Sequence, residues 1–448
     1  MYSPVEEQKY DILSAFALHQ SGALKEAETA YRHILADYPQ DAEVQHYLGV
    51  LLHQMGNTSE AISVILSAMA LDNRHACRYN DLGNIYTQSG DLEKAAIAFG
   101  LSLERNAEDA NVWNNFGSVL HRQKDLVRAE AAYRNAIVAI ADFVPALNNL
   151  AALLAETGQE VESAQLTCQA YIQPPFEGKT AKMLAYAYYN LGRLADAAEC
   201  YRIWLKTEPD NAFAQHHLAA CSGKNVPDKA SVGYLTELFN DMAGHFEDKL
   251  VSKLMYCGPA IIQGLLNGLM TANNRLAVLD GGCGTGLCAP VLVPYAQCLT
   301  GVDISQGMLA KAAEKQCYDV LVEMELTAYL SDRKNTFDLI VMADTLIYFG
   351  ELTGLFANIR QALRPSGYIA FTVEAIDIDP HPIGYQLNAS GRYSHCQSYL
   401  RQLLESQDFT VLKIQEVIVR LELGSPIKAF GVLALQRTPG ERDFEMLN

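Results

Sequence analysis

The chain has 448 residues, a length that fits two or three domains, each with a hydrophobic core of its own. It carries 52 acidic and 34 basic side chains, and the net charge of −18 argues against binding to nucleic-acid phosphates or to an anionic membrane surface. Half of the residues are hydrophobic and 19% are charged, so a disordered or fibrous protein is excluded as well.

Neither a secretory signal nor a membrane span is recognisable in the sequence. The N-terminus lacks a basic segment followed by an apolar one, and no apolar run reaches the roughly 18 residues that a span needs. The ten cysteines include no Cys-x-x-Cys pair, which is typical of reduced thiols and not of a disulfide framework or a zinc site. We therefore expect a cytoplasmic protein that holds no metal ion.

The first half of the chain repeats itself with a period of 34 residues. One column of the repeat holds the small residues Ala15, Gly49, Gly83, Gly117, Ala151 and Ala185. A second column holds Gly22, Gly56, Gly90, Lys124, Gly158 and Gly192. A third, mostly aromatic column holds Tyr31, Ile65, Phe99, Tyr133, Thr167 and Tyr201. Small residues let helices approach closely, glycine suits the turn after a helix, and rings fill the space between helices, so each period predicts two antiparallel helices.

This pattern resembles tetratricopeptide (TPR) repeats, with six repeats over about residues 8–211. Residues 212–221 are expected to form a capping helix, because a terminal repeat needs a polar outer face. We therefore assign residues 1–221 to an all-α TPR superhelix. In TPR proteins the first helix of each repeat lines a concave groove, and its exposed positions in this chain carry Asn80, Asn84, Asn114, Asn115, Asn148 and Asn149.

Two interpretations of these asparagines remain open. An asparagine side chain offers both a donor and an acceptor, so a row of them can pair with the backbone of an extended peptide of any sequence. This arrangement resembles the asparagine-lined grooves of peptide-binding TPR arrays and makes a protein or peptide the expected partner. Alternatively, asparagine is simply common at these TPR positions and contacts only solvent.

The second half of the chain alternates between strands and helices. After a polar linker at residues 222–236, strands are expected at Leu276–Asp280, Leu299–Asp303, Val320–Glu325, Leu339–Ala343 and Tyr368–Glu374. The segments Thr410–Glu422 and Ala429–Gln436 are expected to form a closing antiparallel hairpin. This order predicts a Rossmann-like α/β domain over residues 237–438 with a seven-stranded, mostly parallel sheet, followed by a tail at residues 439–448.

The first of these strands ends in a glycine-rich loop, Asp280-Gly-Gly-Cys-Gly-Thr-Gly. Bare backbone there lets a ligand lie against the strand end and the start of the next helix. A dinucleotide-binding loop would have its third glycine where this chain has Leu287, which weakens a nicotinamide interpretation. Asp303 ends the second strand, and an acid at this place can accept hydrogen bonds from both hydroxyls of a ribose.

These motifs closely resemble those of class I S-adenosylmethionine (SAM) methyltransferases, over about residues 237–437. The resemblance implies that Asp280 and the loop glycines cradle the methionine half of SAM and that Asp303 binds its ribose. It also implies that the product is S-adenosylhomocysteine. The cofactor-binding set that follows is Asp280, Gly282, Cys283, Gly284, Gly286, Asp303, Ile304, Met308, Glu325, Asp344 and Phe246.

Several members of this set carry a particular expectation from the resemblance. Met308 matches a residue that packs near the adenine. Glu325 stands where the family often has an aspartate that reaches the adenine amino group. Phe246 precedes the first strand and is more often a core residue, although the helix before the first strand frequently closes over SAM in this family. Cys283 is expected to be a small residue facing the sheet, because no base adjacent to it is evident.

A narrower resemblance spans both halves of the chain. The segments 238–247, 371–374 and 391–399 are similar to those of predicted bacterial TPR-repeat methyltransferases, a group that implies methyl transfer without a settled substrate. An acceptor must be aligned with the methyl group and sometimes deprotonated. The candidates for positioning or deprotonating it are Asp344, Glu374, His395, Arg392 and Tyr348. A helix cap at Asp344, a loop hydrogen bond at His395 and an Arg392–Glu374 ion pair are the structural alternatives.

Three functional hypotheses follow. The first is a SAM-dependent methyltransferase whose TPR array recruits a polypeptide substrate or partner. The second is a methyltransferase for a small-molecule acceptor, with the array used for docking or assembly. Tyr385, Arg392, Tyr393 and His395 would suit an anionic or aromatic acceptor of this kind. The third is a non-catalytic SAM-binding scaffold.

Overall fold

The computed structural model describes residues 4–438 apart from 243, 245–246, 248–249, 251–253, 268–274, 380 and 423. The chain divides into two compact units, Met1–Glu177 and Gly178–Asn448, and each is described by itself. The predicted order of an all-α repeat region followed by an α/β domain is confirmed. The helices in the described part of the chain all lack the combination of length and apolar character that crossing a membrane requires.

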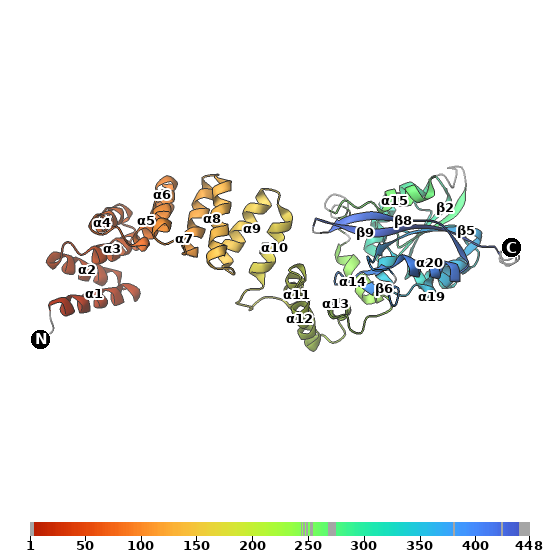
Figure 1. The fold of residues 1–448 in the computed structure, drawn as a ribbon, viewed down its shortest axis with the longest axis horizontal. Helices are drawn as coiled ribbons and strands as arrows, with labels where there is room; N and C mark the ends of the chain where they lie inside the picture. The colour runs from red at the N-terminus through yellow and green to blue at the C-terminus, as the bar shows by residue number, and fades with distance from the viewer. Residues whose placement is uncertain are drawn as a thin grey trace. The chain divides into compact units, whose positions relative to one another are not determined.

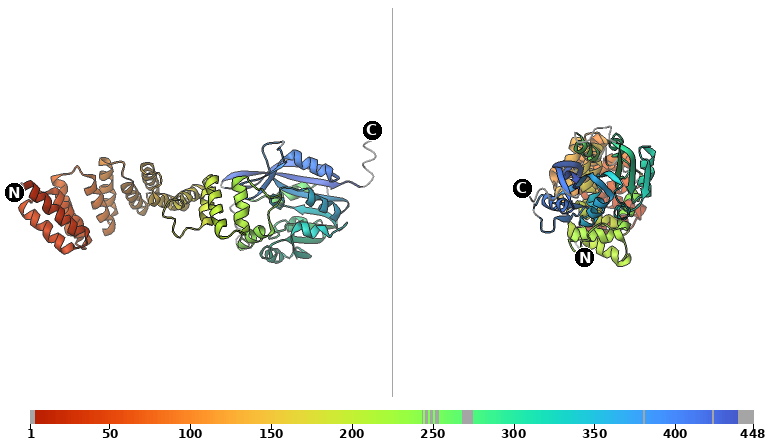
Figure 2. Two further views of the ribbon diagram at one scale, coloured as in Figure 1. Left: turned by 90° about the horizontal axis from the view of Figure 1, so that it is seen from below. Right: turned by 90° about the vertical axis from the view of Figure 1, so that its right-hand side faces the viewer.

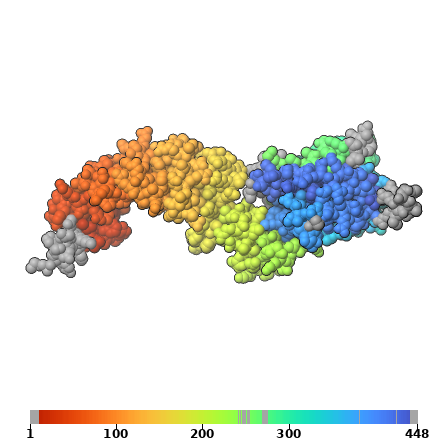
Figure 3. Space-filling model, viewed as in Figure 1, coloured from red at the N-terminus to blue at the C-terminus, as the bar shows by residue number. Residues whose placement is uncertain are grey.

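The first unit consists of consecutive helix pairs (Figures 1 and 2). Its helices are α1 (Pro4–Gln20), α2 (Leu24–Asp37), α3 (Ala42–Gln54), α4 (Thr58–Leu71), α5 (Ala76–Ser89), α6 (Leu92–Arg105), α7 (Ala110–Arg122), α8 (Leu126–Ala139), α9 (Val144–Glu156) and α10 (Glu160–Tyr171). Each pair packs against the next along the chain (Figure 3). The periodic pattern of the sequence therefore corresponds to one helix pair per period.

The columns of the repeat meet inside each helix pair. A Cβ built on Gly83 of α5 would lie 2.7 Å from the ring of Phe99 on α6, and one on Gly117 would lie 2.6 Å from the ring of Tyr133. The small residue of one helix therefore makes room for the aromatic residue of its partner. Between the helices, Gly90 adopts φ = +86° and ends α5 in the left-handed conformation that glycine takes without strain.

The second unit begins with three helices that continue the repeat pattern. They are α11 (Ala181–Asn190), α12 (Leu194–Thr207) and α13 (Ala212–Ser222), followed by α14 (Val232–Met242). The mixed sheet of this unit then contains β1 (Leu276–Gly281), β2 (Ala296–Asp303), β3 (Val320–Glu323), β4 (Phe337–Met342), β5 (Leu363–Ala375), β6 (Tyr385–Leu387), β7 (Tyr393–His395), β8 (Phe409–Glu422) and β9 (Ser425–Gln436). The intervening helices are α15 (Gly258–Leu266), α16 (Ala289–Leu292), α17 (Gln306–Glu314), α18 (Leu326–Ser331), α19 (Thr353–Ala362), α20 (Gln397–Ser406) and a 3-10 turn at Leu346–Tyr348.

The sheet follows the order β3-β2-β1-β4-β5, with parallel pairing, and β9 joins β5 and β8 in antiparallel pairing. Among the described residues it has nine strands, two more than predicted from the sequence. The additional strands β6 and β7 have three residues each and form a hairpin. Strand β7 pairs with the end of β5 at Glu374 and Ala375. Strands this short carry too few residues for a period of two to be recognised.

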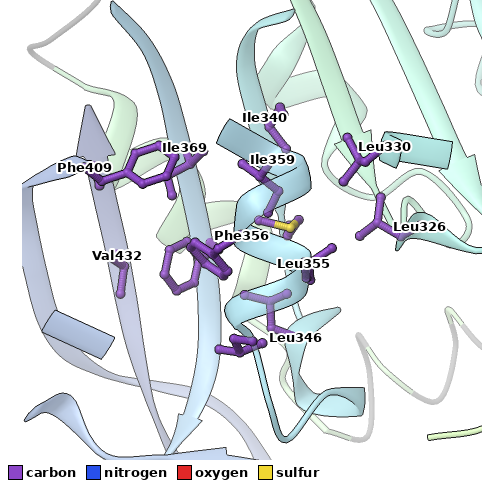
Figure 4. Packing of buried hydrophobic residues seen from close by; sticks show 14 of the residues in the cluster. Leu326, Leu330, Ile340, Leu346, Leu355, Phe356, Ile359, Ile369, Phe409 and Val432 are labelled. Carbon is purple, nitrogen blue, oxygen red and sulfur yellow. The ribbon is translucent and has the colours of Figure 1, made fainter. Parts of the chain in front are cut away.

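Hydrophobic side chains cover both faces of the sheet because successive strand residues point to opposite faces. On one face, Phe356 and Ile359 of α19 pack with strand residues such as Ile369 (Figure 4). On the other face, Ile262 of α15 and Leu292 of α16 belong to a second core. With both faces buried, ligands can reach the sheet only at its edges or at the ends of its strands.

The polar segment at residues 222–236 does not run free between helices. Asp228 accepts hydrogen bonds through its carbonyl from the N–H groups of Gly350 (2.8 Å) and Glu351 (3.0 Å). The N–H of Ala230 donates to the carbonyl of Tyr348 at 2.9 Å, and α14 begins inside the segment, at Val232. A stretch expected to be a linker is thus attached to the loop that follows β4, because its backbone groups find partners there.

Candidate active site

A cavity in the second unit lies at the carboxyl ends of β1, β2 and β4. After β1 it is lined by Asp280, Gly282–Thr285, Leu287 and Cys288. At the end of β2 it is lined by Val302–Ile304 and, beyond them, by Met308. The segment that follows β4 contributes Ala343–Thr345 and Ile347–Phe349. The lining also includes three residues of α14, the segment Met324–Leu326 after β3, and the side chains Leu250, Leu254, Tyr256, Arg392, Arg420 and Glu422. This is the place at which open parallel sheets bind ligands, since several strand ends meet there.

The glycine loop and Asp303 form one hydrogen-bonded unit. The N–H of Gly284 donates to Oδ2 of Asp303 at 2.8 Å, and the N–H of Ser305 donates to Oδ1 at 2.9 Å. Each carboxylate oxygen keeps a lone pair for a further donor, such as a ribose hydroxyl. A Cβ built on Gly284 would meet no described atom within 4 Å, so the loop leaves open space beside its backbone. These residues fit an adenosine-containing cofactor.

Asp280 lies below the loop with only 2% of its surface exposed. The hydroxyl of Tyr318 donates to its Oδ2 at 2.7 Å. Burial nevertheless raises the pKa of Asp280 to about 7 because a charged carboxylate loses its hydration there. A cationic group brought into the cavity would favour the ionised form of this carboxyl. Tyr318 was not foreseen from the sequence, since only the fold brings it next to β1.

The residues predicted near the adenine line the cavity, but Glu325 has another task as well. Its carboxylate caps α18, accepting from the N–H of Ala328 at 2.9 Å and from the hydroxyl of Thr327 at 2.8 Å. Lys229 lies 3.4 Å from the same carboxylate. Ile304 and Met308 provide apolar contact surface, and Met308 is fully buried at the start of α17.

Five charged side chains form a network, and all of them except Glu374 line the cavity. Arg420 of β8 makes a two-pronged contact with Asp344, from Nη1 to Oδ1 (3.0 Å) and Oδ2 (2.7 Å). It also donates to Glu374 through Nη2 and to Glu422 through Nε, the latter at 2.9 Å. Arg392 bridges the same pair, Glu374 at 2.9 Å and Glu422. Three carboxylates thus surround two guanidinium groups, and the ionised network has one net negative charge.

The network lies in a place with little water. The side chain of Arg420 is 2% exposed and that of Glu374 is 8% exposed. Burial raises the pKa of Glu374, and the two arginines oppose that shift. Asp344 sits just after β4 with φ = +59°, and its N–H donates to the hydroxyl of Thr372 at 2.8 Å. At this left-handed residue the chain leaves β4 and continues along the wall of the cavity.

The sequence-predicted catalytic candidates are thus divided by the structure. Asp344, Tyr348 and Arg392 line the cavity. Glu374 does not line it and contacts the cavity through Arg392 and Arg420. His395 is fully buried away from it, and its Nε2–H donates to the carbonyl of Gly350 at 3.0 Å. The loop hydrogen bond considered as an alternative for His395 is the contact that the structure contains.

The remaining cofactor candidates are placed as follows. Gly282, Cys283 and Gly284 line the cavity, whereas Gly286 does not and faces the ring of Tyr318 instead. Burial raises the pKa of the Cys283 thiol, which opposes formation of a nucleophilic thiolate. Phe246 lies outside the described residues. The described part of the chain contains no group of three His, Cys, Asp or Glu side chains arranged to hold a metal ion.

Sequence reasoning missed Arg420 and Glu422. The signal that could have found them is the charge pattern of β8, where Arg420 follows Val417-Ile-Val, three apolar residues of a strand. An arginine within such a run is buried only when carboxylates surround it. Which carboxylates these are depends on β8 pairing with β9 and β9 with β5, and that order is not visible in the sequence.

In the first unit, the asparagines of the predicted groove largely bond with one another. Nδ2 of Asn115 donates to Oδ1 of Asn84 at 3.2 Å, and Nδ2 of Asn149 donates to Oδ1 of Asn114 at 2.9 Å. Asn148 is exposed, and Oδ1 of Asn80 is buried without a partner among the described atoms. Each bonded amide keeps donor or acceptor capacity that these bonds do not use.

These bonds belong to a series that links successive repeats. Four further pairs lie 35 residues apart: His19–Gln54 at 3.1 Å, His46–Asp81 at 2.8 Å, His53–Gln88 at 2.7 Å and His121–Glu156 at 2.9 Å. At the N-terminal end, Phe16, Tyr47, His19 and His46 line a hollow of the surface. The first helices of the repeats thus present a continuous strip of polar and aromatic groups.

Comparison with known proteins agrees with a helical repeat region followed by an α/β domain. Residues 279–371 match the family model described as a methyltransferase domain, and residues 80–145 match that described as a tetratricopeptide repeat. The chain therefore combines TPR repeats with an α/β domain of methyltransferase type. These two matches cover the glycine loop, Asp303, Asp344 and the middle of the repeat region.

The similar proteins are related to part of the chain. A malonyl-[acyl-carrier protein] O-methyltransferase of Acetivibrio thermocellus is 30% identical over 114 residues, which are 23% of this chain and 37% of that protein. A probable S-adenosylmethionine-dependent methyltransferase of Saccharomyces cerevisiae is 26% identical over 165 residues, 34% of this chain and 55% of that protein. The chain thus spans from about two fifths to about half of the length of these relatives.

A solved methyltransferase structure is similar to part of the chain. It is that of the 1,6-didemethyltoxoflavin-N1-methyltransferase of Burkholderia thailandensis with bound 1,6-didemethyltoxoflavin and S-adenosylhomocysteine. The identity is 20% and the TM-score 0.38, with 48% of this chain and 93% of that chain covered.

Proposed function

We propose that the protein is a SAM-dependent methyltransferase whose TPR array recruits a polypeptide substrate or partner. The observation that carries the proposal is the unit formed by the glycine loop and Asp303 at the ends of β1 and β2. Its carboxylate retains acceptor capacity for a ribose, and open space lies beside Gly284. The match of residues 279–371 to a methyltransferase domain supports the same activity.

In this proposal the cavity residues have separate tasks. Asp303 holds the ribose, Ile304 and Met308 contact the adenine, and Asp280 faces the cationic methionine half. Bound SAM supplies an electrophilic methyl group on a positively charged sulfur. The protein must then hold an acceptor in line with that group, and Asp344, Tyr348 and Arg392 lie on the wall where this would occur. A carboxylate such as Asp344 can also accept the proton that an amine or hydroxyl acceptor loses.

The array is proposed to recruit a polypeptide because its first helices present amide groups in successive repeats. Asn84, Asn114, Asn115 and Asn149 each retain donor and acceptor capacity beyond the one bond that they make with one another. Such amides can pair with a peptide backbone. The match of residues 80–145 to a TPR supports an interaction role for this part of the chain.

The experiment is transfer of labelled methyl from SAM into a native lysate that is afterwards separated by size. Wild type is compared with Gly284→Asp, which places a carboxylate next to that of Asp303 and should abolish SAM binding. Gly354→Asp is the matched control, because Gly354 is exposed at the start of α19 with no described atom within 4 Å of its Cβ position. Label in a discrete protein band, lost only in Gly284→Asp, is the expected result.

Two other outcomes separate the competing functions. Label confined to the small-molecule fraction would favour a small acceptor, for which the lining by Tyr256, Tyr348 and Arg392 is the supporting observation. The structure makes an anionic acceptor less suitable than the sequence suggested, since Glu374 and Glu422 already pair with Arg392. Absence of label from both fractions, with SAM binding intact, would contradict methyl transfer and favour the scaffold.

Recruitment by the array has a test of its own. A chain that begins at Gly178 lacks the first unit but keeps the whole second unit with its cores. We expect this chain to bind SAM normally and to label the protein band at a greatly reduced rate. An unchanged rate on every acceptor would show that the array does not recruit the substrate.

A further inference from the structure

Helix α13, which follows the last repeat, contacts the loop that carries Arg392. The side chain of His216 is 4% exposed, and its Nε2 lies 2.8 Å from the carbonyl oxygen of Gly391, the residue before Arg392. A carbonyl only accepts, so Nε2 carries the proton and donates. These two residues are 175 positions apart in the sequence. Figure 1 shows α13 beside α14, within the second unit.

Aromatic rings fix the histidine in place. The ring of His216 stacks on that of Tyr234 of α14, with centroids 4.0 Å apart and an angle of 23°. Gly391 has φ = +83°, and a Cβ there would lie 2.8 Å from Oη of Tyr234 and 2.9 Å from Cε1 of His217. A residue other than glycine would therefore be excluded both by conformation and by contact. Helix α13, helix α14 and the loop are packed as one body at this point.

The segment between α13 and α14 also makes hydrogen bonds with residues at or next to the cavity. The hydroxyl of Tyr393 donates to the carbonyl of Pro227 at 2.6 Å, and the N–H of Ala230 donates to the carbonyl of Tyr348. Tyr348 lines the cavity beside Arg392. Tyr348 and Arg392, two of the three cavity residues proposed to face the acceptor, are thus attached to α13 or to the segment that follows it.

We propose that α13 is part of the acceptor side of the active site and that His216 is a positioning residue for Arg392. The hydrogen bond to Gly391 fixes the backbone from which Arg392 reaches Glu374 and Glu422. This proposal rests on the proposed function, since it takes this wall of the cavity as the acceptor side. It predicts that α13, the helix after the last repeat, serves the chemistry of the second unit, in addition to any role of the repeats in recruitment.

The test compares two substitutions of one side chain in the full-length protein. His216→Phe keeps an aromatic ring against Tyr234 but removes the donor, whereas His216→Gln keeps an N–H that can reach the carbonyl of Gly391. His33→Phe, at an exposed position of α2, is the control for the added hydrophobic ring. Each variant is assayed for SAM affinity by calorimetry and for transfer of labelled methyl at saturating SAM over a dilution series of the lysate.

The expected result separates positioning from general stability. Transfer at limiting lysate should fall about tenfold in His216→Phe, as expected for loss of a buried hydrogen bond, and should return to within about twofold of wild type in His216→Gln. SAM affinity should change less than about twofold in both variants. Unchanged transfer in His216→Phe would overturn the proposal. A parallel loss of SAM affinity, transfer and melting temperature would also overturn it, because the role would then be structural only.

Hydrogen exchange distinguishes a failure of this inference from a failure of the proposed function. If the wild type binds SAM but transfers no label, the proposed function is contradicted, and exchange of the amides of residues 389–396 still tests the positioning contact. Faster exchange of this segment in His216→Phe than in wild type and His216→Gln would support the contact. Equal exchange in all three proteins would overturn it.

Discussion

The two units of this chain are stabilised by contacts of different reach. In the first unit, hydrogen bonds between side chains join residues about one repeat apart, and its ion pairs are partly exposed, as for Arg134 with Glu130 and Glu162. In the second unit, Arg420 pairs with Asp344 from 76 positions away and is almost fully buried. A surface built from local repeats can change one position at a time, whereas a site built from distant buried charges depends on the whole domain.

The largest contrast is expected for the loss of one arginine in each unit. Arg420→Met leaves the carboxylates of Asp344 and Glu374 buried with fewer partners, and we expect the second unit to lose about 3 to 5 kcal/mol of stability. Arg134→Met removes an exposed ion-pair cluster of the first unit and should cost about 1 kcal/mol or less. Denaturant unfolding, monitored in each unit by hydrogen exchange, measures both losses of stability. Equal losses would show that the network is not buried as described.

Loss of Asp303 should remove cofactor binding without affecting the repeats. In Asp303→Ala the glycine loop loses the acceptor of the Gly284 N–H, and the ribose loses both hydrogen bonds. We expect SAM affinity to fall about a hundredfold or more, since hydrogen bonds to a charged group contribute about 1.5 to 3 kcal/mol each. Asp319→Ala is the control: this exposed aspartate accepts from the N–H of Leu299 on the same sheet. Retention of SAM affinity in Asp303→Ala would contradict the proposed site.

In the first unit, two glycine substitutions test the packing between repeat columns. Gly83→Ala forces a methyl group to within 2.7 Å of Phe99, and we expect the first unit to lose about 1 to 3 kcal/mol of stability. Gly100→Ala lies on the neighbouring helix α6 with no described atom within 4 Å of the new Cβ position. Alanine favours the helix there by about 0.5 to 1 kcal/mol. Thermal unfolding should therefore shift in opposite directions for the two variants, and a shared direction would refute the column contact.

A pH effect on SAM binding is expected from one carboxyl of the second unit. Because burial raises the pKa of Asp280 from 3.8 to about 7, the folded protein binds a proton that the unfolded chain releases, and this group lowers stability as the pH rises above 3.8. A cationic ligand needs the ionised carboxylate. SAM affinity should therefore rise about tenfold between pH 6 and pH 8 and level off above, with uptake of the ligand releasing a proton. Asp280→Asn should abolish this pH dependence, and a flat profile in wild type would contradict it.

The sequence allowed the prediction of features that depend on neighbouring residues. The contact of Gly83 with Phe99 spans 16 positions and recurs for Gly49 with Ile65 and for Gly117 with Tyr133, so it is visible as columns. The glycine loop and Asp303 follow two successive strands, and parallel pairing of β1 with β2 brings them together. Both features need only local periodicity and the usual order of a doubly wound sheet.

Other features depend on the tertiary arrangement and could not be predicted. The role of Arg420 requires β9 to lie between β8 and β5. His395 was a candidate by residue type, but the pairing of β7 with β5 places it in the interior. The segment at residues 222–236 has the composition of a linker, yet Asp228 pairs with the backbone of Gly350 and Glu351. In each case the partners are far apart in the sequence: 76 positions for Arg420 and Asp344, 45 for His395 and Gly350, and more than a hundred for Asp228 and Gly350.

The most direct test of the account is a calorimetric titration of the full-length protein with SAM, with S-adenosylhomocysteine and with NAD as the comparison ligand. The account predicts one site per chain for SAM and for S-adenosylhomocysteine, with a Kd of about 1 to 100 μM, and no measurable binding of NAD. Absence of binding for both adenosyl compounds, or binding of NAD with equal affinity, would contradict the assignment of the glycine loop and Asp303 to a SAM site.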